Sequence, residues 1–214
     1  MPINFVAVLD HEHLENSIFL KSFAKSLAKL GDRKGIIVHG DSPYTERLIQ
    51  TGMMREDARL RATKDLNKRL IGLFADQGVV AIGIHGFQKG LIKKNGVKIK
   101  LDVKGLQQIH SVPNLLISNL AEGDDGPKYV PLTEFAYSIS QQLEHAEILL
   151  FSKNEKDEIL ISESETRLSW GDLPKGFAEE SLPEEFKNFD KSVKITTASD
   201  FANWPNLKNV TIIQ

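Results

Sequence analysis

Apolar residues form two alternating patterns along the chain as far as Phe151. Short runs of consecutive apolar residues are typical of strands that a parallel sheet buries on both faces. Stretches in which apolar residues recur every three or four positions predict helices with one buried side. The predicted strands are Ile3–Leu9, Ile36–Val38, Val79–Ile84, Asn114–Ser118 and Ile148–Phe151, and the predicted helices include Asn16–Leu30, Leu66–Phe74 and Pro131–His145. This alternation predicts an α/β protein with its ligand site beyond the carboxyl ends of the strands, near His85–Gly90.

Polar segments between these elements predict the turns. Asn95-Gly96 lies between two arms of alternating polarity, which is a strong signal for a β-hairpin. Ser42 followed by Pro43 predicts a helix that starts there, with Ser42 as its N-cap. The arginine-rich stretch Thr51–Thr63 and the segment Ala121–Tyr129 predict loops, the first of which is expected to approach a ligand.

The chain changes character after residue 152. Residues 153–214 are polar, acidic and rich in turn residues, and strands are predicted only at Val193–Thr196 and Val210–Ile213. We expect residues 1–152 to form the α/β core and residues 153–214 to be a reduced, divergent part of the same domain.

Composition excludes several classes of function. The 214 residues are 41% hydrophobic and carry a formal net charge of −2, so nucleic acid and anionic membranes are not expected as partners. The absence of cysteine excludes disulfides, thiolate zinc sites and a cysteine nucleophile. No apolar run is long enough to span a bilayer, and the first residues lack the basic and apolar regions of a signal peptide. The expected location is cytoplasmic.

Three sequence elements carry a resemblance to a known family. Residues 66–92, LNKRLIGLFADQGVVAIGIHGFQKGLI, resemble the Asn-Lys-x-Leu, Gly-x-x-Ala-x-Gly and Gly-Leu-Ile block of the amino-acid kinase family, and acetylglutamate kinases in particular. Residues 38–43 resemble its Val-His-Gly-Gly-Gly-Pro turn, and Leu60–Thr63 its Leu-Arg-x-Thr element, although the spacer after that element is shorter than in the family. The resemblance implies a three-layer α/β/α sandwich with a mainly parallel sheet, the amino-acid (carbamate) kinase-like fold.

The resemblance also implies a set of ligand residues. Arg61 matches the arginine that holds the carboxylated substrate, Asn67 matches a residue facing the substrate, and Gly40 matches a glycine of the second turn. His39, Asp41, Ser42, His85 and Gly86 are candidates for an anion-binding or pocket-lining turn, because they follow predicted strands at the expected ligand edge. Each has a plainer interpretation: Arg61 as a solvated side chain, Asn67 as an exposed helical residue, and His39 as a partner of its own turn.

The positions that handle phosphate in the family are changed in this chain. Where the family's first strand ends in Lys-x-Gly-Gly, this sequence has Val8–His11, and its first lysine is Lys21. Asp10 and Glu12 stand there instead, and a like charge about 4 Å from a phosphate costs on the order of 4 kcal/mol at an effective dielectric constant near 20. We therefore expect this turn to repel ATP.

Further departures follow along the chain. Asp41 and Ser42 replace two glycines of the second turn, and Pro131 and Thr133 replace the Asn and Asp of the family's Asn-x-Asp-x-x-Ala motif. Ser152-Lys153 replaces a Thr-Asp pair, and the later lysine-bearing helix has no counterpart. No catalytic residue is therefore assigned. His11 and His13 are interpreted as solvated turn residues, and no metal site is predicted, because carboxylate ligands at suitable spacing are missing.

Two functions remain open on the sequence alone. In the first, the chain has lost ATP-dependent phosphotransferase activity, needs no cofactor, and either binds an N-acyl-glutamate-type molecule or pairs as a homodimer or with an active kinase homologue. The helix Asn16–Leu30 or Leu66–Phe74 would then supply the pairing surface. In the second, it is an active acetylglutamate kinase of arginine biosynthesis that uses ATP and Mg²⁺, with Lys89 or another lysine as a substitute cation. Binding of MgATP distinguishes the two.

Overall fold

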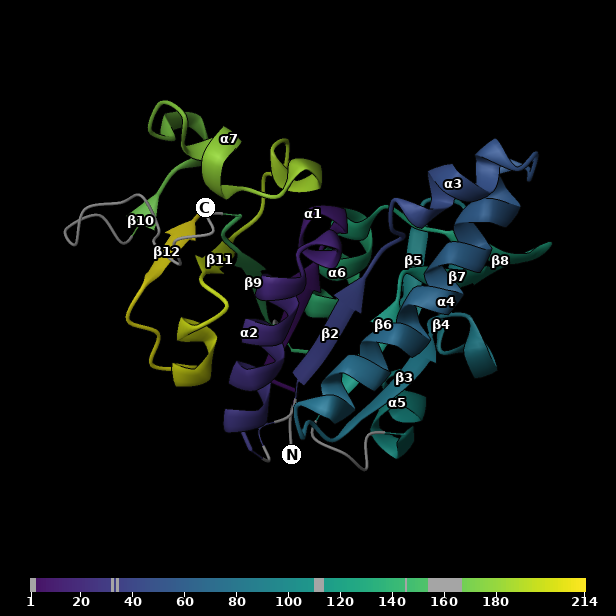
Figure 1. Ribbon diagram of the computed structural model, residues 1–214, viewed down its shortest axis with the longest axis horizontal. Helices are drawn as coiled ribbons and strands as arrows, with labels where there is room; N and C mark the ends of the chain where they lie inside the picture. The colour runs from purple at the N-terminus through teal and green to yellow at the C-terminus, as the bar shows by residue number, and fades with distance from the viewer. Residues whose placement is uncertain (1–2, 32, 34, 110–113, 145, 154–166) are drawn as a thin grey trace.

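The computed structural model describes residues 3–31, 33, 35–109, 114–144, 146–153 and 167–214. Its centre is an eight-stranded sheet in the order β10-β12-β11-β9-β1-β2-β6-β3 (Figure 1). Pairing is parallel from β11 through β9, β1, β2 and β6 to β3, and β12 runs antiparallel to β11. The strands are β1 Phe5–Leu9, β2 Gly35–His39, β3 Ala81–His85, β6 Asn114–Ser118, β9 Glu147–Phe151, β10 Arg167–Leu168, β11 Val193–Thr196 and β12 Val210–Ile213.

Helices cover both faces of this sheet. Helices α2 (Ser17–Lys29) and α4 (Arg55–Asp76) lie on one face, and α6 (Leu132–Gln142) lies on the other (Figure 1). Successive strand residues point to opposite faces, so Ala7 and Ile37 pack with α2 and α4 whereas Val6 and Val38 pack with α6. The three-layer α/β/α sandwich predicted from the sequence is confirmed.

A second, four-stranded sheet in the order β5-β4-β7-β8 lies beside the large one. Strands β4 (Ile92–Asn95) and β5 (Lys98–Leu101) form the predicted hairpin, whose tip has Gly96 at φ 60°. Strands β7 (Leu120–Gly123) and β8 (Gly126–Tyr129) form another hairpin in the segment predicted to be a loop. That prediction was wrong because Gly126, at φ 116°, allows a tight turn at which the two strands pair.

The loop prediction for residues 51–63 was also wrong, because helix α4 already begins at Arg55. Ala58 and Ala62 lie four residues apart and are buried against Leu48 of helix α3 (Tyr44–Gln50). Together they extend the apolar side of α4 by two turns, while the arginines and acidic residues occupy the remaining surface. Small apolar residues among many charged ones gave a weak periodic signal in the sequence.

Two local predictions need correction. Ser42 does not cap α3: Pro43 holds the N-cap position, and Ser42 contributes its carbonyl oxygen, which accepts a hydrogen bond from the Thr45 N–H at 2.9 Å. Strand β3 is not buried on both faces, because it is the last strand of the sheet and Gly83 at its centre is exposed. An apolar run therefore marked an edge strand here, not a central one.

The C-terminal part adds short elements around the predicted strands β11 and β12. Helix α7 (Phe177–Ser181) and the 3-10 turn η3 (Glu184–Phe186) lie beyond the ends of the strands, near the short helix α1 (Figure 1). Of the helices within the described ranges, none combines the length and the apolar composition that a membrane span requires. The remaining elements are α1 His11–Glu15, η1 Gln88–Gly90, α5 Val103–Ile109, η2 Trp170–Asp172 and η4 Asp200–Asn203.

Close packing between β1 and β2 gives a test of this arrangement. A Cβ atom on Gly35 would lie 1.9 Å from Cζ of Phe5, whose buried ring is packed edge-on against Phe201 and Trp204. Gly35→Ala is therefore expected to lower the free energy of unfolding by about 1–3 kcal/mol in denaturant titrations.

Gly72 in α4 is the matched control, because a Cβ there would meet no atom within 4 Å. Gly72→Ala is expected to leave stability unchanged or to raise it by up to about 1 kcal/mol through helix propensity. Equal effects of the two substitutions would contradict the packing described for Phe5.

Candidate functional site

The carboxyl ends of β1, β2, β6 and β3 meet at one edge of the sheet, where parallel α/β proteins bind their ligands. Asp10, Gly40, Asn119 and Gly86 are the residues that follow these four strands. The predicted candidates therefore divide into two groups at this edge: His39, Gly40, Asp41 and Ser42 after β2, and His85 and Gly86 after β3.

His39 is fully buried at the end of β2 and makes two hydrogen bonds. Its Nδ1 donates to the carbonyl oxygen of Gly40 at 2.8 Å, and its Nε2 accepts from Nδ2 of Asn67 at 3.0 Å. Burial lowers the pKa of His39 to about 4, despite the opposing effect of the Gly40 carbonyl, and the nearby His85 lowers it further. The ring is therefore neutral at pH 7 and holds its own turn, as the plainer interpretation of His39 predicted.

Asn67 projects from α4 into the ends of three strands. Besides His39, its Nδ2 contacts the carbonyl oxygens of Ile84 in β3, at 3.3 Å, and Leu116 in β6, at 3.5 Å. Its side chain is buried, so it is neither the exposed helical residue considered above nor open to a ligand. Gly83 must lack a side chain here, because a Cβ would lie 2.4 Å from Oδ1 of Asn67.

Arg61 does not reach this edge. It lies on α4 with its side chain 60% exposed, and the ion pair that the described residues give it, to Asp65, is long at 3.9 Å. Two residues along a helix correspond to a rotation of about 200° around its axis, so their side chains project in nearly opposite directions. Arg59 therefore faces the sheet while Arg61 faces solvent. The placement of Arg61 as a substrate contact is therefore not supported by its position.

Arg59 is the arginine that reaches the strand ends. Its Nε donates to Oδ2 of Asp41 at 3.2 Å, and its guanidinium lies 4.3 Å from the ring centroid of Tyr129. Gly40 itself is buried, and a Cβ there would be in van der Waals contact, 3.6 Å from both the Tyr129 hydroxyl and Nδ2 of Asn119. Burial raises the pKa of Tyr129, and Glu185 and Asp41 raise it further, so its hydroxyl stays protonated. These residues form a small polar cluster around Gly40.

The end of β1 is occupied by an internal carboxylate. Asp10 is fully buried and caps α1, with its Oδ1 accepting hydrogen bonds from the backbone N–H groups of Glu12 and His13. Nδ1 of His13 lies 3.1 Å from the same oxygen. Burial opposes ionisation of Asp10, but the hydrogen bond and charge of His13 outweigh it and lower its pKa. His13 is thus buried and not solvated, which corrects the prediction for it.

A second carboxylate occupies the start of α6. Oε2 of Glu185, from η3, accepts a hydrogen bond at 3.2 Å from the N–H of Leu132, the first residue of that helix. Burial raises the pKa of Glu185 against the effect of this bond, and the nearby Asp10 and Asp41 raise it further. Helix N-termini attract anions through free N–H groups and the helix dipole. Here the chain supplies that anion itself.

The end of β3 has a different character. Nδ1 of His85 lies 3.0 Å from the hydroxyl oxygen of Ser118, its register partner on β6. The His85 ring stacks on Phe87 with 5.7 Å between centroids, and Nζ of Lys64 lies 5.2 Å from the Phe87 centroid. Burial lowers the pKa of His85, and the charges of Lys64 and Lys68 lower it further. Cations thus gather around β3, whereas carboxylates gather around β1.

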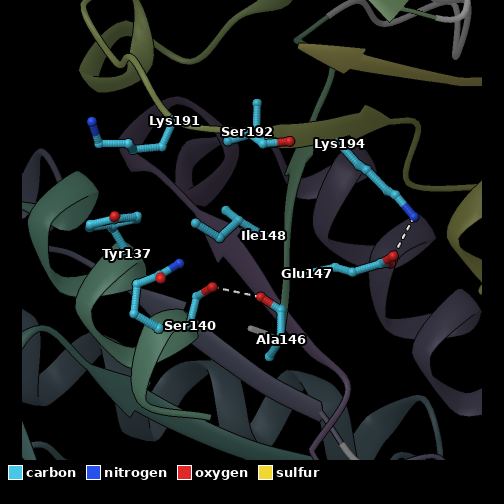
Figure 2. A pocket seen from close by; sticks show the side chains of 10 residues that line it. Tyr137, Ser140, Ala146, Glu147, Ile148, Lys191, Ser192 and Lys194 are labelled. Atoms are coloured by element: carbon cyan, nitrogen blue, oxygen red, sulfur yellow. Dashed lines mark hydrogen bonds and ion pairs between the residues drawn. The ribbon is translucent and has the colours of Figure 1, made fainter. Parts of the chain in front are cut away.

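A cavity of about 380 Å³ lies away from this edge, between α6 and the amino ends of β9 and β11 (Figure 2). The Ser140 hydroxyl on its wall donates to the carbonyl oxygen of Ala146 at 2.6 Å. Its charged side chains are already paired, Lys194 with Glu147 and Lys191 with Asp190. No candidate residue lines it, and within the described ranges no group of three His, Asp or Glu residues is placed to hold a metal ion.

Four residues at the ligand edge were not predicted from the sequence: Arg59, Tyr129, Asn119 and Glu185. The first three lie within or beside stretches that were predicted to be loops, so their faces were unknown. Glu185 is 53 residues from Leu132 in sequence, and nothing local indicates their contact. Ala58, Ala62 and Leu66 recur every four residues, which is the spacing of one side of a helix. That signal would have placed the neighbouring Arg59 near the buried side of α4.

Comparisons with known proteins identify the fold. No family model and no curated protein sequence matches the chain. Isopentenyl phosphate kinase is similar in structure, with a TM-score of 0.63 at 12% identity over 98% of this chain and 99% of that one. N-acetylglutamate synthase from Neisseria gonorrhoeae gives 0.62 at 15% identity over 99% of this chain and 59% of that one. Aspartate kinase from Synechocystis gives 0.63 at 9% identity over 99% of this chain and 40% of that one.

These likenesses confirm the predicted amino-acid kinase-like fold. They do not favour acetylglutamate kinase, because kinases of an isoprenoid phosphate and of an amino acid match equally well at such low identity. The chain spans less than two thirds of the synthase and aspartate kinase chains.

The buried, neutral state of His39 predicts a pH dependence of stability. The unfolded chain binds a proton at His39 below about pH 6.5, whereas the folded chain does not do so until about pH 4. Stability from this group is therefore fully present above pH 6.5 and falls as the pH decreases towards 4. The expected loss at pH 5 is on the order of 2 kcal/mol, measured as the free energy of unfolding in urea at pH 7 and pH 5.

His39→Gln keeps a polar side chain and removes the titration, so the difference between pH 7 and pH 5 should shrink. His85→Gln is the comparison, because His85 is only half-buried and its contribution is smaller. An undiminished difference in the His39 variant would refute a neutral His39 as its source.

Proposed function

We propose that this chain is a kinase-fold protein without phosphotransferase activity, which binds a small carboxylate-bearing molecule. The observation that carries the proposal is the Glu185 carboxylate on the first N–H of α6, in a neighbourhood that also contains Asp10 and Asp41. By the resemblance, the end of β1 and the start of α6 are positions that handle the transferred phosphoryl group. Acidic side chains fill both.

Electrostatics argues against ATP at these positions. Phosphoryl transfer relies on cations and backbone N–H groups aimed at the phosphates. Here Asp10 takes the N–H groups of α1, and Glu185 takes the first N–H of α6. Lys153, which follows β9, is bound to Glu12 at 3.4 Å and is mostly buried. To reach these N–H groups, a triphosphate would have to displace the Asp10 and Glu185 carboxylates, and it would still be repelled by their negative charges.

The active-kinase alternative with Lys89 as substitute cation is disfavoured by the strand order. Lys89 follows β3, which is separated from β1 by β6 and β2. At about 4.8 Å per strand, the two strand ends are roughly 14 Å apart, which is beyond the reach of one lysine side chain.

Arg59 is the proposed contact for the carboxylate. A guanidinium binds a carboxylate bidentately, and that of Arg59 is one-third exposed while Tyr129 and Asp41 fix its orientation. The gonococcal synthase of the same fold is described in complex with N-acetyl-glutamate, which makes N-acyl-glutamates the first molecules to test. Pairing as a homodimer or with an active kinase homologue, through α2 or α4, is the second route by which such a protein would act.

Ligand-dependent unfolding tests this function. We expect N-acetylglutamate or N-succinylglutamate to raise the melting temperature, since a ligand at a hundred times its Kd stabilises the folded state by about 2.7 kcal/mol. MgATP should yield no ADP in the presence of an acyl-glutamate, because carboxylates occupy the phosphoryl positions. Acyl-glutamate-dependent formation of ADP would refute the loss of activity.

Arg59→Gln and Arg61→Gln form a matched pair on α4. If only the Arg59 variant loses the rise in melting temperature with an acyl-glutamate, the ligand's carboxylate binds at the cluster around Gly40. Loss in the Arg61 variant alone would contradict the geometry described here. If no acyl-glutamate gives a shift, the carboxylate-binding proposal fails, and size measurements with and without kinase homologues test the pairing role.

A further inference from the structure

The cationic groups at the end of β3 form a cluster that the proposed function does not use. Lys64 and Lys68 lie one turn apart on α4, on the side that faces β3, and both act on the half-buried His85. Among the described residues neither lysine has a carboxylate within 4.0 Å, unlike Arg59, Lys93 and Lys94, which are all paired. Two unpaired ammonium groups beside an imidazole attract an anion.

Hydrogen bonding makes the imidazole a donor towards solvent. The Ser118 hydroxyl is fully buried, and His85 Nδ1 is the partner that the described residues provide for it. A buried hydroxyl proton without an acceptor is costly, so Ser118 donates to Nδ1. The proton of the neutral ring then resides on Nε2, which has no partner among the described residues. The cluster therefore presents donors only.

Phe87 adds an apolar surface to these donors. Its partly buried ring stacks on His85 at an interplanar angle of 6° and lies beneath the Lys64 ammonium. Lys89, two residues later, has a left-handed backbone at φ 56°, which is uncommon for a residue with a side chain and often marks a functional turn. A ligand that carries both an oxyanion and a flat ring would fit this combination of groups.

The surroundings reinforce the attraction. Residues 58–104 contain eleven lysines and arginines but only the acids Asp65, Asp76 and Asp102, in a chain whose formal net charge is −2. On the neighbouring hairpin, Lys93 and Lys100 are direct cross-strand partners. Like charges in such a pair destabilise the hairpin. Such a concentration of one sign raises the local concentration of anions.

We propose that Lys64, Lys68 and His85 form an oxyanion-binding site at the carboxyl end of β3, with Phe87 as a platform for a planar group of the same ligand. The ligand class is an aromatic or heteroaromatic phosphate or carboxylate. This site is separate from the cluster around Gly40, because Arg59 contacts Asp41 and Tyr129 and none of the β3 groups. The proposal therefore stands whether or not Arg59 binds a carboxylate.

Calorimetric titration with phenyl phosphate and with inorganic phosphate tests the site. Phenyl phosphate should bind more tightly than phosphate because its ring gains contact with Phe87. In the Lys64→Gln/Lys68→Gln double variant, both affinities should fall at least about tenfold, since hydrogen bonds to charged groups are lost. Phe87→Leu should reduce the preference for phenyl phosphate and leave the affinity for inorganic phosphate unchanged.

The Lys21→Gln/Lys25→Gln double variant of α2 is the control. These lysines are also four residues apart, exposed and unpaired within the described residues, so the variant removes the same charge from another helix. Equal losses of affinity in the two double variants would mean a general charge effect and overturn the site. Absence of binding by the unaltered protein at millimolar phenyl phosphate would overturn it as well.

NMR titration of the histidine rings gives a readout that does not depend on affinity. His85 is surrounded by Lys64, Lys68 and, further in, by His39, so a bound anion should raise its pKa by about one unit and leave that of His39 nearly unchanged. An unchanged pKa of His85 in saturating phenyl phosphate would place the ligand elsewhere and refute the proposal. Arg59→Gln should retain this response, which keeps the test independent of the proposed acyl-glutamate site.

Discussion

The buried amide of Asn67 fixes helix α4 on the sheet, and the rest of the ligand edge depends on that register. Its Nδ2 reaches His39 of β2, the Ile84 carbonyl of β3 and the Leu116 carbonyl of β6, so one side chain ties the helix to three strands. Once Asn67 points inward, helical geometry places Arg59 towards Tyr129 and Arg61 towards solvent. Lys64 and Lys68 then lie along the side that faces β3. The directions in which these four cationic side chains of α4 project are thus set by the neutral side chain of Asn67.

The sequence predicted the layers of the fold well, because consecutive apolar residues and helical spacing report burial directly. The prediction failed where burial does not follow from how apolar a residue is. Ala58 and Ala62 are buried but small, so the first two turns of α4 resembled a polar loop. Strand β3 is apolar yet lies at the edge of the sheet, because apolar composition does not reveal strand order. The Leu60–Thr63 resemblance misplaced the ligand arginine for the same reason: a four-residue match carries no information about which side of a helix each residue occupies.

Most residues proposed for the site lie at the carboxyl edge of the sheet, but the contacts that hold them were not predicted from the sequence. His39 and Asn67, proposed as ligand residues, are each other's partners in the protein interior. Contacts distant in sequence decide this. Glu185 reaches Leu132 from a C-terminal segment without regular periodicity, and Asp10 contacts His13 of the short helix that it caps. A carboxylate that the sequence suggests is exposed in a turn can therefore be buried and hydrogen-bonded. It then occupies the anion position of that turn itself.

The ligand edge is divided by charge along the sheet. Asp10, Asp41 and Glu185 lie close enough to influence one another around β1 and β2, and Lys64, Lys68 and His85 lie around β3. Neighbouring strands are only about 4.8 Å apart, so a small molecule that bridges both regions would have to present a cationic or neutral end to β1 and an anionic end to β3. The phosphates of MgATP do not meet the requirement at β1, because they are anionic. Lys64 and Lys68 lie beside β3, three strands away from the turn after β1, and this separation is the basis of both the proposed loss of activity and the proposed anion site.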